Sequence, residues 1–310
     1  MIQTVLSTLL QVFTPLSIPV IVGVLLVRTK NLETKHVLTL VLYFLTPCII
    51  FKTLISAEIS FEEIYMTLSF SILNLVLLWI TANILGKILK LAAPEIAGLT
   101  LISTLSNSVN YGLPLVLLAF GQLGMDKASI YIVVQIITVN TIGVYFAARS
   151  KFSVKDAVKS VFSLPAIYAA ALAIVLRLFN LHLPEGIEKG VAMVAQAYSP
   201  IVLVILGAQM ANVKNSELEQ RTQTAFWAGL SVRLLLSPLI AGFVLYILGI
   251  SGTLFSVLLV LASMPVAVNA VILAEKFDAS PEIVSKCILW TTLASFVVLP
   301  ILIVLVKTIS

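Results

Sequence analysis

The sequence predicts an all-α integral membrane protein with ten transmembrane helices, arranged as two five-helix repeats of opposite orientation. Three observations support this prediction. Hydrophobic residues make up 60% of the chain and charged residues 11%, with a mean hydropathy of +1.12, whereas about a quarter of the residues of a soluble domain are charged. Most apolar runs have about the 20 residues that cross the hydrocarbon core of a bilayer. Two of these runs are interrupted by amide residues and proline at corresponding places in the two halves.

The ten spans follow one another with short connections, so no appended soluble domain is expected. We place them at residues 5–27, 37–56, 64–86, 97–121, 128–148, 160–179, 191–212, 224–249, 253–275 and 283–307. The first span has no basic segment before it and no evident small-residue cleavage site. It is therefore expected to be a retained helix rather than a signal peptide.

Basic residues concentrate in the loops that follow odd-numbered spans. These loops hold twelve of the nineteen basic residues: Arg28, Lys30, Lys35, Lys87, Lys90, Arg149, Lys151, Lys155, Lys159, Lys214, Arg221 and Lys276. Cytoplasmic loops carry the excess of Lys and Arg. We therefore expect a protein of the cell membrane with both termini on the side opposite the cytoplasm. The basic excess thus orients the chain in the lipid bilayer and does not indicate a nucleic-acid partner.

The two halves of the chain repeat a pattern of prolines. Three pairs lie 150 to 153 positions apart: Pro15 and Pro165, Pro47 and Pro200, Pro114 and Pro265. The pairs agree with a division into repeats at 1–150 and 151–310, joined by the basic segment 149–159. Because five helices are an odd number, the second repeat enters the membrane from the opposite side. This inverted repeat is common among secondary transporters.

The first interruption reads SNSVNYGLP at residues 106–114. Ser103, Asn107, Asn110 and Pro114 recur at intervals of 4, 3 and 4, which would put them on one face of a helix. Gly112 lets the backbone bend, and the proline removes a hydrogen-bond donor and blocks helical bonding one turn earlier. An isolated asparagine usually joins transmembrane helices. Here two amides lie beside a helix break, and a second break lies at a corresponding place in the other half of the chain. This combination favours a binding site instead.

The second interruption reads SMPVAVN at residues 263–269, where Ser263, Pro265 and Asn269 play the same part. Lipid cannot satisfy free backbone groups, so both breaks are expected to face protein or a water-filled cavity. Free helix ends offer N–H groups and a positive dipole end to an anion. Paired breaks in the two halves are the best sequence sign of a transporter's substrate site. The apolar lining expected around the amides, suited to an aromatic or alicyclic body, is Val109, Leu113, Val266 and Val268.

Other polar residues within spans are few. Tyr131, Gln135 and Thr138 form a stripe in the fifth span that should face the interior. Gln135 is the best further candidate for substrate binding, and a hydrogen bond between helices is its alternative role. Arg233 is the one charge placed well inside a span. We favour an anchoring role for it over a substrate role, since it can extend partway toward the cytoplasmic edge or pair with a helix end.

The residue pattern excludes several classes of function. It holds no metal-ligand cluster, no phosphate-binding glycine loop and no grouped acid, base and nucleophile, so we expect no cofactor, no metal and no enzymatic activity. The remaining hypothesis is a carrier that moves a small organic anion unchanged. Two alternatives stay open: a sodium-coupled symporter, and a membrane sensor that binds the anion without moving it.

Four segments in the same order and spacing resemble the auxin efflux carrier family, which includes the plant PIN carriers and bacterial permeases for malonate or malate. They are LYFLTPCIIFKTL, NSVNYGLPLVLLAFG, RLLLSPLIAGFVL and MPVAVNAVILAEKFDASPEIV, in spans 2, 4, 8 and 9. A more distant resemblance is to bile-acid:sodium symporters. Plant members have an aspartate in the third span, where Asn74 is the nearest polar residue here.

The resemblance implies that spans 4 and 9 cross at their breaks, with the substrate carboxylate beside the crossing. Asn107 matches the family's crossover asparagine, Pro265 its second crossover proline, and Gln135 a glutamine that contacts substrate. It further implies a scaffold part and a transport part, an elevator-like shift of one against the other, and a homodimer formed through scaffold helices.

Overall fold

The computed structural model describes residues 9–57, 60–148, 159, 162–212 and 220–309. The repeat boundary at 150 and, apart from Lys159, the junction 149–159 lie outside these residues, as does Lys214. Within the described ranges the secondary structure is helical, apart from one isolated β-bridge. Seven helices are long and apolar enough to cross a membrane: Leu10–Lys30, Thr34–Ser56, Phe61–Ile88, Ser108–Ala148, Glu185–Ala211, Thr222–Ile247 and Pro281–Thr308.

Two expected spans are not continuous helices. Residues 97–121 divide between α6 (Ala93–Thr104), a wide turn η3 (Ser108–Gly112) and α7 (Leu113–Thr138). Residues 253–275 divide between α14 (Gly252–Ala262) and α15 (Asn269–Phe277). The chain does not leave helical geometry between expected spans 4 and 5 except at Gly121, where φ is 64° and ψ is −156°. Seven helices in the described ranges are therefore long enough to cross a membrane, and the ten-span inverted repeat stays a proposal.

Prolines shape the wide turns of several helices. Four five-residue π-helical turns each end two residues before a proline: η1 (Leu9–Phe13), η2 (Val41–Leu45), η3 and η6 (Val232–Leu236) precede Pro15, Pro47, Pro114 and Pro238. Proline donates no hydrogen bond and its ring crowds the carbonyl one turn earlier. A wider turn relieves that contact, which is a recognised cause of helix bending.

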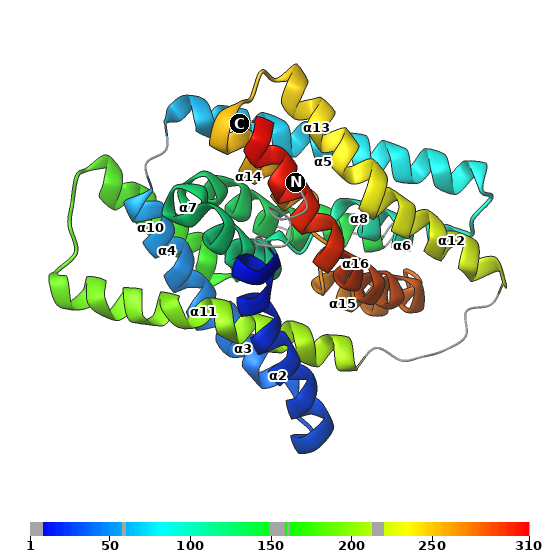
Figure 1. Ribbon diagram of the computed structural model, residues 1–310, viewed down its shortest axis with the longest axis horizontal. Coiled ribbons are helices and arrows are strands. Elements are labelled where there is room, and N and C mark those ends of the chain that lie inside the picture. Colours follow the sequence, from blue (N-terminus) through cyan, green and yellow to red (C-terminus); the bar gives the residue numbers. More distant parts are fainter. Residues whose placement is uncertain (1–8, 58–59, 149–158, 160–161, 213–219, 310) are drawn as a thin grey trace.

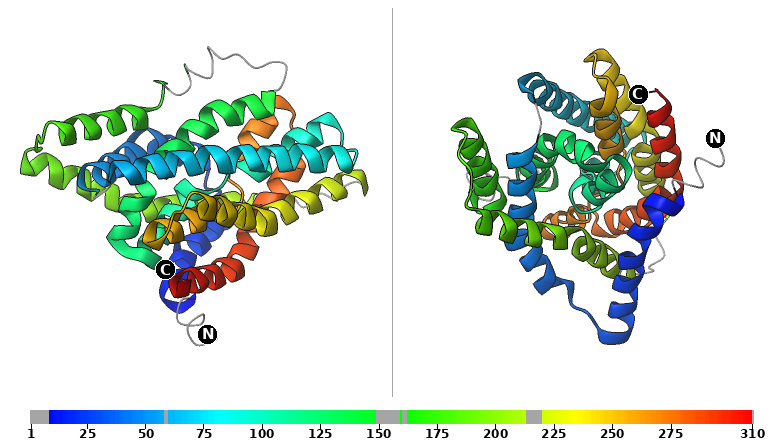
Figure 2. Two further views of the ribbon diagram at one scale, coloured as in Figure 1. Left: turned by 90° about the horizontal axis from the view of Figure 1, so that it is seen from above. Right: turned by 60° about the vertical axis from the view of Figure 1, so that its left-hand side comes forward.

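One set of helices, here called the outer group, packs largely on itself (Figures 1 and 2). Its members are α2 (Thr14–Lys30), α3 (Thr34–Leu40), η2, α4 (Thr46–Ser56), α10 (Pro165–Leu178) and α11 (Glu185–Ala211). α2 packs on α11, and α4 packs on α10 and α11. A separate apolar cluster between α4 and α10, which includes Phe51, Leu54 and Ala170, stabilises this group.

Two glycines let α2 and α11 approach closely, because each glycine lies against a valine carbonyl of the other helix. A Cβ atom on Gly23 of α2 would lie 2.0 Å from the carbonyl oxygen of Val204. A Cβ atom on Gly207 of α11 would lie 1.9 Å from the carbonyl oxygen of Val20. Each backbone thus presses directly against the other, as small residues allow at helix contacts in membranes.

The remaining helices, here called the crossing group, surround the two interrupted helices. They are α5 (Phe61–Ile88), α6, η3, α7, η4 (Val139–Gly143), α8 (Val144–Ala148), α12 (Gln220–Ser231), η6, α13 (Ser237–Ile247), α14, α15 and α16 (Pro281–Ile309). Buried side chains of α6, α7, α14 and α16 form most of its core. The interruptions are therefore enclosed by protein.

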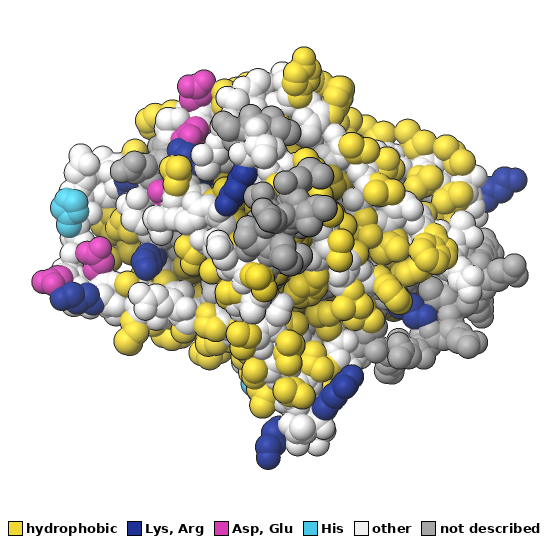
Figure 3. All heavy atoms as spheres, in the orientation of Figure 1, with side chains coloured by type: hydrophobic (Ala, Val, Ile, Leu, Met, Phe, Trp, Pro, Cys, Tyr) yellow, Lys and Arg dark blue, Asp and Glu magenta, His cyan; other side chains and the backbone are white. Residues whose placement is uncertain are grey.

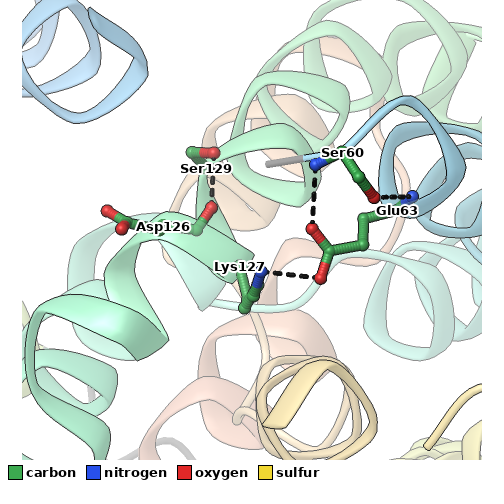
Figure 4. A network of polar contacts seen from close by, with 5 residues as sticks. All are labelled: Ser60, Glu63, Asp126, Lys127 and Ser129. Atoms are coloured by element: carbon green, nitrogen blue, oxygen red, sulfur yellow. Dashed lines mark hydrogen bonds and ion pairs between the residues drawn. The ribbon is translucent and has the colours of Figure 1, made fainter. Parts of the chain in front are cut away.

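A polar brace ties the start of α5 to α7. Ser60 and Glu63 form a reciprocal capping box, in which each side chain bonds the other's backbone N–H. The free carboxylate oxygen of Glu63 pairs with Lys127 Nζ at 2.6 Å (Figure 4). Lys127 follows the bend at Gly121, so the brace holds α5 beside the part of α7 that comes after the bend.

The exterior is strongly apolar. Hydrophobic side chains cover much of the face in Figure 3, and several Lys and Arg side chains lie at its tips. Large apolar residues are widely exposed, among them Ile18, Leu239 and Tyr246. Such a surface is unsuited to water and suited to lipid.

The glycine contact predicts a large difference between two matched substitutions in α11. Gly207→Ala forces two backbones apart, and overpacking of this kind costs about 1–3 kcal/mol. Gly190 has open space around it, and alanine there favours the helix by about 1 kcal/mol. In thermal unfolding of the purified protein, Gly207→Ala should lower the melting temperature and Gly190→Ala should not. Equal melting temperatures would contradict the close packing of α2 on α11.

Candidate binding site

The two interrupted helices meet backbone to backbone. Asn107 N–H donates to the carbonyl of Pro265 at 2.8 Å, and Ala267 N–H donates to the carbonyl of Leu105 at 2.8 Å. Ser106 stands opposite Val266 in this antiparallel bridge. A local two-fold axis relates these two hydrogen bonds to each other. Each interrupted segment therefore satisfies backbone groups of the other. Enclosed non-helical backbone at membrane depth requires such partners.

This geometry corrects two expectations from the sequence. Residues related by the local axis, such as Ser106 and Val266, are 160 positions apart, so the offset near 151 that pairs Pro114 with Pro265 does not describe the crossing. Pro265 lies within the bridge, whereas Pro114 begins α7. Ser103 also does not share a helix face with Asn107, because α6 ends at Thr104 and the helical period is lost beyond it.

A cavity of about 230 Å³ lies beside the crossing, between the two groups of helices. Five residues predicted for the site line it: Asn107, Asn110, Gln135, Val268 and Asn269. Other polar lining comes from Thr46, Ser106 and Asn140. The apolar lining is Leu42, Val109, Ile136, Val139, Leu164, Ala166, Ala267, Ile272 and Leu273. The cavity thus combines a cluster of amides with a larger apolar wall, and among the described residues no charged side chain lines it.

The amides are presented mainly as donors. Asn107 is 3% exposed, and its buried Nδ2 has no hydrogen-bond partner within the part of the chain that the structure describes. Asn110 accepts through Oδ1 from the Tyr198 hydroxyl at 3.2 Å, so its NH₂ group remains for other partners. Gln135 Nε2 lies 3.5 Å from both the carbonyl and the hydroxyl oxygen of Ser106, which is long for a hydrogen bond. A buried donor without an acceptor is costly, and a bound acceptor would remove that cost.

Two helical segments begin at the cavity. Their first hydrogen bonds run from Tyr111 N–H to the Asn107 carbonyl and from Ala270 N–H to the Ala267 carbonyl. The N–H groups of 108–110 and 268–269 precede these bonds, and first-turn N–H groups have no acceptor within their own helix. Both segments therefore place their first residues and their positive dipole ends beside one cavity, which favours an anion.

Four residues predicted for the site lie beside the cavity without lining it. Gly112 packs on α14, where an added Cβ would lie 2.8 Å from Leu261 Cδ2. Ser263 Oγ donates to the Leu259 carbonyl at 2.7 Å. Pro265 accepts from Asn107 N–H in the bridge, and Pro114 starts α7. These residues shape the backbone rather than face the cavity.

The sequence interpretation missed three polar lining residues. Ser106 lies inside the first interrupted segment, and Thr46 lies directly before Pro47 in the second span. Asn140 lies one turn and a half after Gln135, and its Nδ2 donates to the Ile136 carbonyl at 2.8 Å. The break at 106–114 and Pro47 were available signals for Ser106 and Thr46, and the polar stripe that ends at Thr138 was the signal for Asn140. The predicted stripe of Tyr131, Gln135 and Thr138 is confirmed as inward-facing, since all three are buried.

Arg233 occupies the opposite side of the crossing. It is 1% exposed, and Nε donates to the Met264 carbonyl at 2.7 Å. Its Nη1 donates to the Ser103 carbonyl at 3.0 Å and Nη2 to the Ala262 carbonyl at 2.5 Å. Ser103 and Ala262 stand at the C-terminal ends of α6 and α14. Of the two arrangements expected for Arg233, the structure shows pairing with a helix end, and the side chain joins two such ends.

Long apolar helices and two interrupted helices that meet beside a polar cavity are typical of membrane transport proteins. Residues 8–303 match the family model described as membrane transport protein. The chain belongs to this family, the auxin efflux carrier family, and is a multi-pass membrane protein. It is 28% identical to an uncharacterized transporter of Methanothermobacter thermautotrophicus, over 82% of this chain and 83% of that one. It is 27% identical to an uncharacterized transporter of Methanocaldococcus jannaschii, over 87% and 89% of the two chains.

Cysteine labelling tests whether water reaches the cavity. In a background with Cys48 and Cys287 replaced, Asn269→Cys places a thiol on the cavity wall, and Ser263→Cys places one behind the crossing. A hydrophilic maleimide should label the first and leave the second largely unlabelled, because only the first side chain lines the cavity. Equal labelling of both positions would contradict the position of the cavity.

Proposed function

We propose that the protein is a secondary transporter of small organic anions, whose carboxylate binds at the crossing. The observation that carries this proposal is the buried Nδ2 of Asn107, a donor without a partner on the wall of a cavity. Two helix N-termini and the NH₂ group of Asn110 converge on the same cavity. An oxyanion is the ligand that satisfies several donors at once.

The chemistry of the lining suits transport rather than permanent binding. A bound carboxylate would meet neutral amides and backbone N–H groups, since no charged side chain of the described ranges lines the cavity. Neutral donors hold an anion more weakly than an ion pair does. The apolar wall, which includes Val109, Val268 and Ile272, suits the body of a monocarboxylate with an aromatic or alicyclic part. Short dicarboxylates are the second group of candidate substrates.

The arrangement of the two groups supports alternating access by an elevator-like shift. Of the residues that line the cavity, Leu42 and Thr46 belong to the outer group, and Leu164 directly precedes α10 of that group. The amides that line the cavity belong to the crossing group. Movement of one group along the other would carry a ligand bound between them. In this proposal the outer group is the scaffold through which a homodimer forms, in a cell membrane with both termini outside the cytoplasm.

Helix packing supports an inverted repeat of ten spans. Counted as spans, α2 and α11 are the first and seventh, and α10 and α4 are the sixth and second. In a five-plus-five repeat, span 1 corresponds to span 6 and span 2 corresponds to span 7. The contact of α2 with α11 therefore corresponds to the contact of α10 with α4, and both contacts are present. The local two-fold axis at Ser106 and Val266 has the same effect on the crossing.

A binding screen with matched variants tests the proposed function. The purified protein is heated with indole-3-acetate, malonate, malate, butyrate or cholate, each with and without sodium, because a ligand of the folded state raises apparent stability. A carboxylate that stabilises the wild type should fail to stabilise Asn107→Ala. Loss of a hydrogen bond to a charged group weakens binding by about tenfold to a hundredfold.

Asn83→Ala is the control, since Asn83 lies on α5 and bonds the Trp79 carbonyl within its own helix. It should bind and transport as the wild type does, whereas Asn107→Ala should reduce uptake into proteoliposomes to background. Unchanged uptake by Asn107→Ala would remove the crossing from the substrate site. Stabilisation that requires sodium would favour a sodium-coupled symporter. Binding without any flux would favour a sensor.

A further inference from the structure

We infer that Arg233 makes the cavity selective for anions, by neutralising the two helix ends that point away from it. This inference rests on the proposed function and concerns a residue that does not line the cavity. It begins from an unusual arrangement: a guanidinium that is 1% exposed bonds three main-chain carbonyls from both interrupted helices. No ion pair joins it to a carboxylate within the described part of the chain.

The charge of Arg233 matches the charge of the helix ends. The C-terminal end of a helix carries about half a negative charge, because its last carbonyls lack intrahelical donors. α6 ends beside Ser103 and α14 ends beside Ala262, and the guanidinium bonds both carbonyls. The two ends together carry about one negative charge, which one guanidinium balances. Ser237 Oγ adds a neutral bond to the Ala262 carbonyl at 3.1 Å.

The balance matters because the ends are close to the cavity. Ser103 is three residues before the lining residue Ser106, and Met264 is three residues before the lining residue Ala267. Three residues of chain span at most about 10 Å. At that distance and in the effective dielectric of a protein, one uncompensated negative charge weakens anion binding by about tenfold. The net attraction of the positive N-terminal ends at 108–110 and 268–269 for an anion is therefore greater while this charge is cancelled.

Arg233 is therefore a positioning residue with an electrostatic effect that a purely structural role does not have. A structural role alone predicts that its loss lowers affinity for every ligand alike. Charge balance predicts that its loss lowers affinity for an acid much more than for the neutral amide of the same shape. The ratio of the two dissociation constants separates these roles.

The test measures that ratio for pairs of probes: indole-3-acetate with indole-3-acetamide, malonate with malonamide, and butyrate with butyramide. Arg233→Met removes the charge, and the acid-to-amide preference should fall about tenfold. Arg233→Lys keeps the charge but cannot reproduce the three hydrogen bonds of the planar guanidinium. This variant should keep the acid-to-amide preference and have a lower melting temperature. A preference that is unchanged in Arg233→Met would overturn the inference.

A second pair of variants keeps Arg233 in place, in case its replacement prevents folding. Ser237→Asp adds a carboxylate beside the guanidinium, and Ser237→Asn adds a neutral group of the same shape. The aspartate variant should lose the preference for acids by about tenfold, and the asparagine variant should keep it. Equal preference in both would overturn the inference while the wild type still binds carboxylates. If no acid of the panel binds the wild type, the proposed function fails as well.

Discussion

The backbone bridge between residues 105–107 and 265–267 is the constraint on which the rest of the structure depends. An interrupted helix exposes polar backbone groups that lipid cannot satisfy. Here each interruption supplies the partners of the other, through the Asn107–Pro265 and Ala267–Leu105 hydrogen bonds. Thr291 of α16 satisfies one more group by accepting from Val266 N–H at 3.2 Å. Neither interruption is stable alone, so the crossing forms only when both halves of the chain are packed.

The crossing divides four helix ends into two pairs. The C-terminal ends of α6 and α14 turn toward Arg233, whereas the N-terminal ends at η3 and α15 turn toward the cavity. The same bridge thus creates a negative region that needs a cation and a positive region that suits an anion. A buried guanidinium without a carboxylate partner, costly elsewhere, has a clear physical reason here. The proposed anion site and the satisfaction of the backbone groups thus depend on one arrangement.

The amides of the site could be predicted because an amide within an apolar run is rare and needs a reason. Asn107, Asn110 and Asn269 all line the cavity, as expected. Ser103 and Pro114 do not, because the helical period was extended across a segment that is not helical. The partners of Arg233 are main-chain carbonyls, which leave no trace in the sequence. Proline spacing near 151 indicated two related halves, yet the crossing relates residues 160 apart, since the prolines occupy different places in the two breaks.

The most direct measurement is an experimental structure in a lipid nanodisc with the carboxylate that stabilises the protein most. The account predicts density for the carboxylate beside Asn107 Nδ2 and the N–H groups of 108–110 and 268–269, with the backbone bridge intact. Density for the ligand at another place in the fold, or an uninterrupted helix through either segment, would contradict the central claim.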